Sequence, residues 1–184
     1  MSDQLNFFVP GIPVPGGSKR AFMMHRKGCP AGRKHNPGAC HCRPFTTVVD
    51  AAGQANKDWR TAVVKFAYEA AHEYGGILPM FSAAISVEFT FWLPRPKGHY
   101  NAKGQLLPSA PEYPTTRPDV LKLARAVEDA LTGIIWTDDS LIVHEILEKD
   151  YASRTNVSGL LAQIKLMASS QEIIRLADAT GKMI

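Results

Sequence analysis

The stretch that says most about the architecture runs from Arg117 to Val143 and reads RPDVLKLARAVEDALTGIIWTDDSLIV. Its first half predicts an amphipathic helix over residues 118–131, because apolar side chains recur at spacings of three and four. We expect Thr116 to cap this helix, Pro118 to lie in its first turn, and Thr132-Gly133 to end it. The expected apolar stripe consists of Val120, Leu123, Ala124, Val127, Ala130 and Leu131.

Further elements are predicted on both sides of this stretch. Runs of β-branched and aromatic residues favour strands over residues 5–9, 82–93, 142–151 and 160–166. Helical spacing favours a helix over residues 50–74 and a short final helix over residues 169–177. Residues 94–118 contain six prolines, which predicts a long irregular loop. A length of 184 residues fits one domain over residues 1–184.

Composition is that of an ordinary globular protein, with 45% hydrophobic and 21% charged residues. No apolar run approaches the ~18 residues that cross a bilayer, and the opening MSDQ lacks the positive start of a signal peptide. We therefore expect a cytoplasmic protein without a membrane partner. The net charge of +4 is unevenly spread, because residues 1–60 hold nine Lys or Arg against three Asp or Glu. Residues 4–49 contain no acidic side chain, which fits attraction of a polyanion or a merely solvated basic loop.

Three carboxylates flank the predicted helix. Asp119 stands at its start, and Asp138 and Asp139 lie in the turn after it. A carboxylate cluster suits Mg²⁺, which takes oxygen ligands and leaves positions for water and substrate phosphate. The alternative is structural, with Asp119 stabilising the helix N-terminus and Asp138-Asp139 forming a turn. The sequence alone leaves open whether the two ends of the helix converge.

The same stretch resembles the RusA-type Holliday junction resolvases. Their pattern is Pro-Asp-x-Asp-Asn-Leu-x-Lys-(x)3-Asp-Ala-Leu, then a short turn, an aromatic residue and Asp-Asp-Ser/Ala-x-Ile/Val. The opening run from Phe8 to Pro15, followed by Lys19-Arg20, is similar to that family's first strand and basic loop. The residues in register with the central pattern are Pro118, Asp119, Leu123, Asp129-Ala130-Leu131, Trp136, Asp138-Asp139 and Val143.

This resemblance implies a homodimeric α+β protein, often phage-encoded, with a mixed β-sheet and two main helices packed on it. The implied activity is Mg²⁺-dependent cleavage of four-way DNA junctions in recombination and repair. Asp119 and Asp139 correspond to metal-ligating carboxylates and Asp138 to an assisting neighbour. Arg125 stands at the family's lysine; arginine keeps the charge but cannot serve as a proton donor near neutral pH.

One departure from the family pattern bears on catalysis. Leu121 occupies the place of the second aspartate, and Lys122 that of the asparagine. A site that uses three aspartates therefore lacks one ligand, for which Glu128, Asp129 and Glu88 are candidate substitutes. The alternative to an active nuclease is a catalytically impaired protein that still binds branched DNA.

A basic insert over residues 17–45 holds all three cysteines and three of the six histidines. An odd number of thiols in the cytoplasm argues against a disulfide framework and favours structural Zn²⁺, which would order a loop poor in apolar residues. Free thiols in a basic loop are the alternative. A zinc-stabilised nucleic-acid-binding module is accordingly a third functional hypothesis. The expected ligands are Cys29, Cys40, Cys42 and either His35 or His25.

DNA contacts are expected from basic side chains near strand ends and on the predicted helix, with aromatic side chains that stack on exposed bases. Each of these residues could instead be ordinary surface or core. The basic candidates are Lys19, Arg20, Arg95, Lys97 and Lys122, and the aromatic ones are Trp92 and Tyr100.

Overall fold

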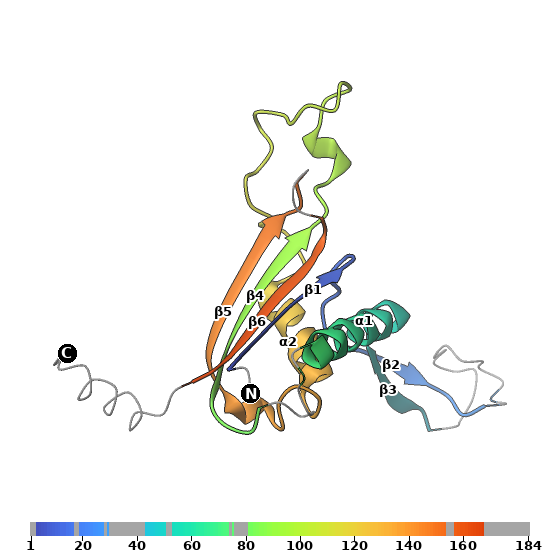
Figure 1. Ribbon diagram of the computed structural model, residues 1–184. Coiled ribbons are helices and arrows are strands. Elements are labelled where there is room, and N and C mark those ends of the chain that lie inside the picture. Colours follow the sequence, from blue (N-terminus) through green and yellow to red (C-terminus); the bar gives the residue numbers. More distant parts are fainter. Residues whose placement is uncertain are drawn as a thin grey trace, which may run out of the picture.

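The computed structural model describes residues 3–16, 19–27, 29, 43–50, 53–73, 75, 81–153 and 157–167. A four-stranded mixed sheet, ordered β1-β6-β4-β5, forms the centre of this part (Figure 1). β6 runs antiparallel to both neighbours, and β4 and β5 are parallel. The strands are β1 (Gln4–Pro10), β4 (Ile85–Leu93), β5 (Ile142–Tyr151) and β6 (Gly159–Leu166). The predicted α+β class and mixed sheet are confirmed.

Alternation along the strands explains how the sheet buries one face. In β4 every second residue from Ile85 to Leu93 is buried, and the residues between them are partly exposed. β1 and β6 bury Leu5, Val9 and Ile164 in the same core. β5 differs, because it is the edge strand and its residues 143–146 are exposed.

Two helices pack into the core formed by the sheet, as predicted. α1 (Gly53–Glu73) contributes Trp59 and Val63. α2 (Val120–Leu131) buries one side of its amphipathic surface and contacts α1, β4 and β5. The helix stops at Thr132, and Gly133 follows with a φ of +77° that favours glycine. Its buried residues are Leu123, Ala124, Ala126, Val127, Ala130 and Leu131.

The start of α2 differs from the sequence prediction. Asp119, not Thr116, is the N-cap residue, and Pro118 precedes the helix. Pro118 disfavours helical backbone at the residue before it, so a helix that starts after Thr116 is disfavoured. The expected helix over residues 169–177 lies outside the described residues.

Part of the predicted irregular insert is regular. β2 (Lys19–Met24) and β3 (Phe45–Asp50) form an antiparallel pair that projects from the body (Figure 1). Apolar side chains such as Phe22, Met23 and Val48 are exposed on this hairpin. Its strands therefore lack the alternation of buried and exposed residues by which a strand is predicted from sequence. No described residue of this hairpin belongs to the hydrophobic core.

The loop between β4 and α2 is held at several points. Lys149 Nζ donates to the carbonyl oxygens of Thr116 and Pro118 at 2.9 Å each. Arg95 donates to the carbonyl oxygens of Pro111 and Glu112, and the loop contains a 3₁₀ turn, η1 (Lys97–His99). The backbone that leads to Asp119 is therefore fixed to β5. Within the described ranges, no helix is long and apolar enough to cross a bilayer.

Candidate active site

The exposed side of α2 carries the chemistry-bearing residues. Its buried side is taken up by the core, so the remaining positions face solvent along the length of the helix. Two pockets open on this exposed side, one at the start of α2 and one along its length. The exposed residues are Leu121, Lys122, Arg125 and Asp129, with Glu128 half-buried.

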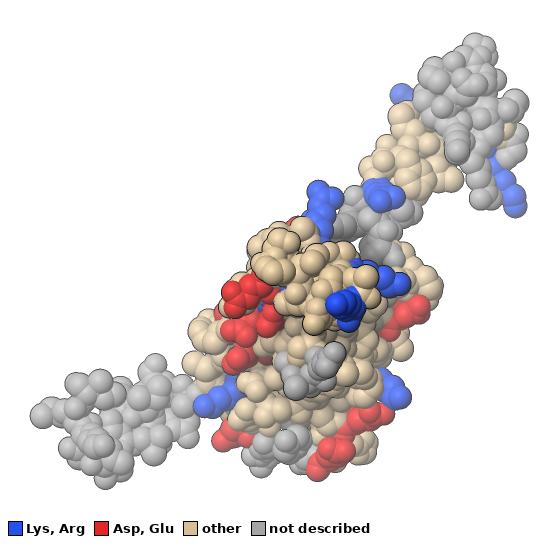
Figure 2. All heavy atoms as spheres, turned by 90° about the horizontal axis from the view of Figure 1, so that it is seen from above, with Lys and Arg blue, Asp and Glu red and all other residues tan. Residues whose placement is uncertain are grey.

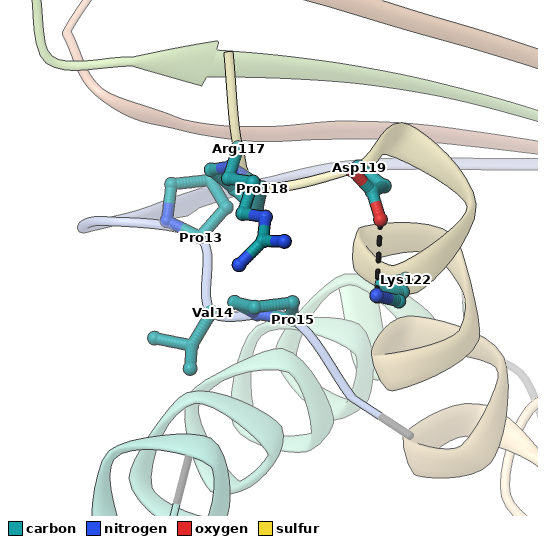
Figure 3. Close-up of a pocket in the computed structure, with 7 residues that line it drawn as sticks. All are labelled: Pro13, Val14, Pro15, Arg117, Pro118, Asp119 and Lys122. Carbon is teal, nitrogen blue, oxygen red and sulfur yellow. Dashed lines mark ion pairs between the residues drawn. The ribbon is translucent and has the colours of Figure 1, made fainter. Parts of the chain in front are cut away.

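The pocket at the start of α2 has apolar walls and two cationic side chains. It encloses about 450 Å³ and includes the guanidinium of Arg117 and the ammonium of Lys122 (Figure 3). Lys122 Nζ lies 3.0 Å from Asp119 Oδ2, and the two side chains form an ion pair. The lining residues are Pro13, Val14, Pro15, Arg117, Pro118, Asp119 and Lys122.

Asp119 is held in its ionised form. The hydrogen bond and charge of Lys122 lower the pKa of Asp119, and the positive charges of Arg117 and Lys149 lower it further. Its carboxylate makes no capping hydrogen bond to the helix. The Asp119 side chain therefore lines the pocket and does not cap the helix.

The wall formed by residues 13–16 is tied to both helices. Gly16 N donates to Lys122 O at 2.7 Å, and Asn56 Nδ2 donates to Pro15 O at 3.1 Å. A Cβ at Gly16 would lie 3.1 Å from Ala126 Cα, which explains why a glycine stands where this wall crosses α2. The two segments that line the pocket, residues 13–15 and 117–122, are thus both held by hydrogen bonds.

The second pocket extends along α2 from Leu121 to Asp129 and is acidic. It encloses about 280 Å³, and four of its side chains are carboxylates against one guanidinium, that of Arg125. Arg60 engages one of the four, because its Nη2 donates to Asp129 O at 2.6 Å and its Nη1 lies 4.0 Å from Asp129 Oδ2. The lining residues are Leu121, Ala124, Arg125, Glu128, Asp129, Asp139 and Glu145.

Glu128 is the most perturbed carboxyl group of this pocket. Partial burial, a hydrogen bond with Glu145 and the negative charges of Glu145, Asp139 and Asp129 raise the pKa of Glu128 to about 8. Glu128 therefore keeps its proton at neutral pH. The main cause is its partial burial, to which the neighbouring negative charges add; a bound cation would favour the ionised form.

Asp139 is oriented by donors from the turn that follows α2. Thr132 Oγ1 donates to its carboxylate, and Trp136 Nε1 donates to the same oxygen at 3.2 Å. Trp136 is fully buried, so this carboxylate is attached to the core although it faces the pocket.

Asp138 has a different role. It is the N-cap of the 3₁₀ turn η2 (Asp139–Leu141), and its Oδ1 accepts from Ser140 N at 2.9 Å. Hydrogen bonds from the side chain and backbone of Ser140 lower the pKa of Asp138. Of the predicted pair, Asp139 lines the acidic pocket and Asp138 makes the turn.

Asp119 and Asp139 do not meet within one chain. They stand at opposite ends of a helix of 12 residues, which spans about 18 Å, and they belong to different pockets. Leu121 is 69% exposed and lines the acidic pocket. The aspartate expected at that position would face the same space.

The structure shows which candidate substitutes for the missing aspartate line the acidic pocket. Glu128 and Asp129 line the acidic pocket, whereas Glu88 lies on β4 and lines neither pocket. Glu145 was missed from sequence; its only signal was an acidic residue six positions after Asp139, at the start of the strand. Within the described ranges, no three His, Cys, Asp or Glu side chains are arranged to hold a metal ion.

Comparison with known proteins decides the family. The sequence pattern described as "Endodeoxyribonuclease RusA" matches residues 34–158, about two thirds of the chain. The chain belongs to the RusA endodeoxyribonuclease family. In this RusA-family chain, the match includes both pockets of α2, although Pro13–Pro15 at the edge of the first pocket precede it. The resemblance stated from sequence is confirmed.

A curated relative is also similar over part of the chain. "Uncharacterized protein YqaN" of Bacillus subtilis (strain 168) is 28% identical over 87 residues. These residues make up 46% of this RusA-family chain, which spans about three fifths (61%) of the length of that relative. The likeness adds no function, because the relative's name assigns none.

The predicted zinc ligands fall mostly outside the structure. His35, Cys40 and Cys42 lie outside the described residues. Cys29 is described, and its backbone N–H donates to Arg26 O at 3.1 Å; His25 is buried. The zinc site therefore stays a prediction.

Some of the predicted DNA-contacting residues are exposed to solvent, whereas others contact the rest of the protein. Arg20 is exposed on β2, and Lys97 is exposed on η1, whereas the side chain of Lys19 lies outside the described part. Lys122 lines the first pocket, as above. Arg95 holds the loop, with its guanidinium 4.0 Å from the ring centre of Tyr151.

The aromatic candidates differ in exposure. Trp92 packs beside Phe8, with ring centres 5.9 Å apart, whereas Tyr100 is 39% exposed. Figure 2 shows acidic side chains on several sides of the body, and most of the visible Lys and Arg side chains toward the end that carries the hairpin. The basic segment inferred from sequence thus coincides with a projecting structure.

Proposed function

We propose that this RusA-family protein is a Mg²⁺-dependent endodeoxyribonuclease that cleaves four-way DNA junctions during recombination and repair in the cytoplasm. The observation that carries the proposal is the opposite charge of the two pockets on α2. One presents Arg117 and Lys122, and the other presents Asp139 beside Glu128 and Glu145. A phosphodiesterase needs both, since it must hold the DNA backbone and stabilise charge at the scissile phosphate.

The first pocket suits the DNA backbone. Arg117 is an exposed cation on a wall fixed by hydrogen bonds, and Lys122 would exchange its ion pair with Asp119 for a phosphate. The projecting hairpin adds Arg20, with exposed Phe22 two residues further along the same strand and exposed Phe45 on the partner strand, a combination typical of surfaces that hold unpaired nucleotides. Such contacts read the shape of DNA and not its base sequence.

The acidic pocket suits a divalent cation. Carboxylate oxygens are the donors that Mg²⁺ prefers, and the pocket holds four carboxylates against one guanidinium. Asp139 would hold the ion together with one neighbouring carboxylate, Glu128 or Glu145, and water would complete its coordination. When bound, the ion would activate a water and neutralise charge on the phosphate.

Arg125 completes the acidic pocket as a phosphate contact. Its guanidinium is always charged and can bridge two phosphate oxygens, but it has no proton to give near neutral pH. Protonation of the leaving oxygen then falls to water. Asp119, the other proposed metal ligand, precedes α2, whereas Asp139 accepts from Thr132 at the other end of this helix, which is about 18 Å long; the two aspartates therefore cannot reach the same ion within one chain.

A labelled synthetic four-way junction, incubated with the purified protein and Mg²⁺ or Mn²⁺, tests the proposal. The expected result is cutting that stops in EDTA and in Asp139→Asn. Asp58→Asn is the matched control, because Asp58 is an exposed helix residue that hydrogen-bonds only Gln54 among the described contacts. Failure of the wild-type protein to cut or bind the junction would contradict the proposal.

A second candidate function is junction binding without catalysis. Leu121 favours it, because an exposed apolar side chain stands in the acidic pocket at the position of a family aspartate. The same experiment separates the two, since this candidate requires tight, metal-independent binding without cutting. Leu121→Asp should then restore cutting.

The zinc proposal has its own test. We propose that Cys29, Cys40 and Cys42, with His35 or His25, hold one structural Zn²⁺. Metal analysis of protein purified without chelator is expected to find about one zinc per chain. A zinc content near zero would contradict this site and leave the nuclease proposal unaffected.

A further inference from the structure

The hydroxyl of Thr132 lies where the last turn of α2 meets the carboxylate of Asp139. Thr132 Oγ1 is hydrogen-bonded to Asp139 Oδ1 and lies 2.9 Å from Glu128 O. Trp136 Nε1 lies 3.1 Å from the same hydroxyl oxygen and 3.2 Å from Asp139 Oδ1. Thr132 and Trp136 therefore connect an exposed carboxylate to a fully buried ring.

A threonine hydroxyl has a single proton to donate, and the surrounding bonds decide which acceptor receives it. Glu128 O already accepts the backbone N–H of Thr132 at 2.9 Å, so this carbonyl does not need the hydroxyl. The indole N–H of Trp136 can only donate, so toward this ring the hydroxyl is an acceptor. An ionised carboxylate is a stronger acceptor than a peptide carbonyl. The Thr132 proton is therefore directed to Asp139 Oδ1.

The turn that carries both donors is held by backbone hydrogen bonds. Gly133 N donates to Trp136 O at 2.7 Å, and Thr137 N donates to Phe81 O at 3.3 Å. The backbone thus fixes the spacing between Thr132 and Trp136, and both donors keep one direction toward the carboxylate.

These two donors occupy one oxygen of Asp139 and leave the other open. Oδ1 accepts from both Thr132 and Trp136. Within the described ranges, neither a hydrogen bond nor an ion pair reaches Oδ2, and the exposed residue lines the acidic pocket. Asp139 is therefore prepared to offer a single oxygen to a cation.

A carboxylate that offers one oxygen distinguishes between divalent cations. Ca²⁺ takes about six to eight oxygens in a flexible arrangement and accepts both oxygens of one carboxylate. Mg²⁺ demands near-octahedral geometry and usually binds one or two carboxylates with several waters. Mn²⁺ suits the same oxygen ligands as Mg²⁺. A carboxylate whose second oxygen is occupied by protein donors thus favours Mg²⁺ and Mn²⁺.

We propose that Thr132, together with Trp136, is a positioning residue that occupies Oδ1 of Asp139 and makes this carboxylate a single-oxygen ligand selective for Mg²⁺ or Mn²⁺ over Ca²⁺. The inference rests on the proposed function, because it requires that Asp139 binds the cation. Thr132 acts through Asp139 and is not itself a ligand. Loss of such a partner of a metal-binding side chain typically lowers metal affinity about 10- to 100-fold.

Cation binding to the DNA-free protein tests this inference without cleavage. Mn²⁺ titration followed by electron paramagnetic resonance measures the dissociation constant of Mn²⁺, and competition against Mn²⁺ measures those of Mg²⁺ and Ca²⁺. Thr132→Val keeps the shape of the side chain and removes the hydroxyl, so Mn²⁺ and Mg²⁺ should bind about 10-fold more weakly. The affinity for Ca²⁺ should change by less than about twofold, because the released oxygen can join its coordination.

Three further variants locate the effect. Thr132→Ser keeps the hydroxyl and should bind all three ions as wild type does, whereas Thr132→Ala should repeat the loss seen in Thr132→Val. Thr61→Val on α1 is the matched control and should equal wild type, because Thr61 Oγ1 also lies 2.9 Å from the carbonyl oxygen four residues earlier. Urea unfolding of each variant in EDTA measures whether the fold is kept.

The outcomes separate this inference from the proposed function. Unchanged Mn²⁺ affinity in Thr132→Val, equal weakening of Mn²⁺ and Ca²⁺, or a loss that Thr132→Ser shares would overturn the positioning role alone. Mn²⁺ binding that survives Asp139→Asn would place the ion elsewhere and also overturn the inference. A wild-type protein that binds no Mn²⁺ would contradict the metal dependence of the proposed function, and the inference with it.

Discussion

The two ends of α2 differ in charge and in how they are attached to the molecule. At the first end, the ion pair with Lys122 lowers the pKa of Asp119, which lines a pocket with proline walls. At the other end, partial burial and the neighbouring carboxylates raise the pKa of Glu128, so this side chain keeps its proton at neutral pH. In the proposed nuclease, α2 therefore keeps two functions apart. DNA is held at the basic end of the helix, and the cation is held at the acidic end.

Trp136→Phe is expected to have the largest effect on stability, because it detaches the acidic end from the core. Trp136 is fully buried, and its Nε1 donates to Thr132 Oγ1 and Asp139. Loss of these bonds and of the larger ring should lower the free energy of unfolding by about 2–3 kcal/mol. Urea denaturation measures this loss. A stability equal to wild type would show that the acidic end does not depend on this attachment.

The raised pKa of Glu128 predicts a pH-dependent stability of the metal-free protein. The carboxyl group has a pKa of about 4.5 when unfolded and about 8 when folded, so the folded state binds more protons between these values. Stability should therefore fall as pH rises from about 4.5 to 8. After allowance for solvent screening of this half-exposed group, the loss should be about 1–2 kcal/mol.

Glu128→Gln provides the control for that pH dependence. The variant has no carboxyl group at this position, so its unfolding free energy should be flatter over the same pH range. Thermal or urea unfolding in EDTA at several pH values measures both proteins. Identical pH profiles would show that the carboxylates of the acidic end do not repel each other as described.

Arg117→Gln should weaken the basic end alone. Loss of one phosphate contact should reduce junction affinity about 10-fold at low salt and reduce the salt slope by about 1. Cleavage at saturating DNA should remain close to wild type. Lys65→Gln on α1 is the matched control. Arg95→Gln would not be suitable, because Arg95 holds the loop between β4 and α2. A fall in cleavage at saturation would mean that the two ends do not divide the tasks.

Asp138→Asn should have the smallest effect. Its oxygen caps a 3₁₀ turn, and an asparagine oxygen can accept the same bond from Ser140 N. Cleavage should change by less than about threefold. A loss as large as that expected for Asp139→Asn would assign catalysis to both neighbours.

Periodicity predicted the parts of the fold that are buried on one side. α2 and β4 were located because a buried stripe or alternation is visible in the sequence. The hairpin of β2 and β3 was missed, since Phe22 and Val48 are exposed and packing imposes no such pattern. The N-cap is Asp119 in place of Thr116, because Pro118 disfavours helical backbone at Arg117.

The candidate site was predictable residue by residue but not in its arrangement. The motif named Asp119, Asp139 and Arg125, yet it could not show that the two aspartates lie at opposite ends of the helix. Glu145 was missed, because a glutamate on an edge strand looks like an ordinary solvent-facing residue. Its meeting with Glu128 depends on how β5 returns along α2.

Paired binding and cutting measurements on Asp139→Asn test the division of tasks most directly. Binding of a labelled four-way junction in EDTA should equal that of wild type, because the basic end is untouched. Single-turnover cutting in Mg²⁺ should fall by at least about 1,000-fold, since the oriented carboxylate of the acidic end is lost. Cutting that survives this substitution, or junction binding that is lost with it, would contradict the account.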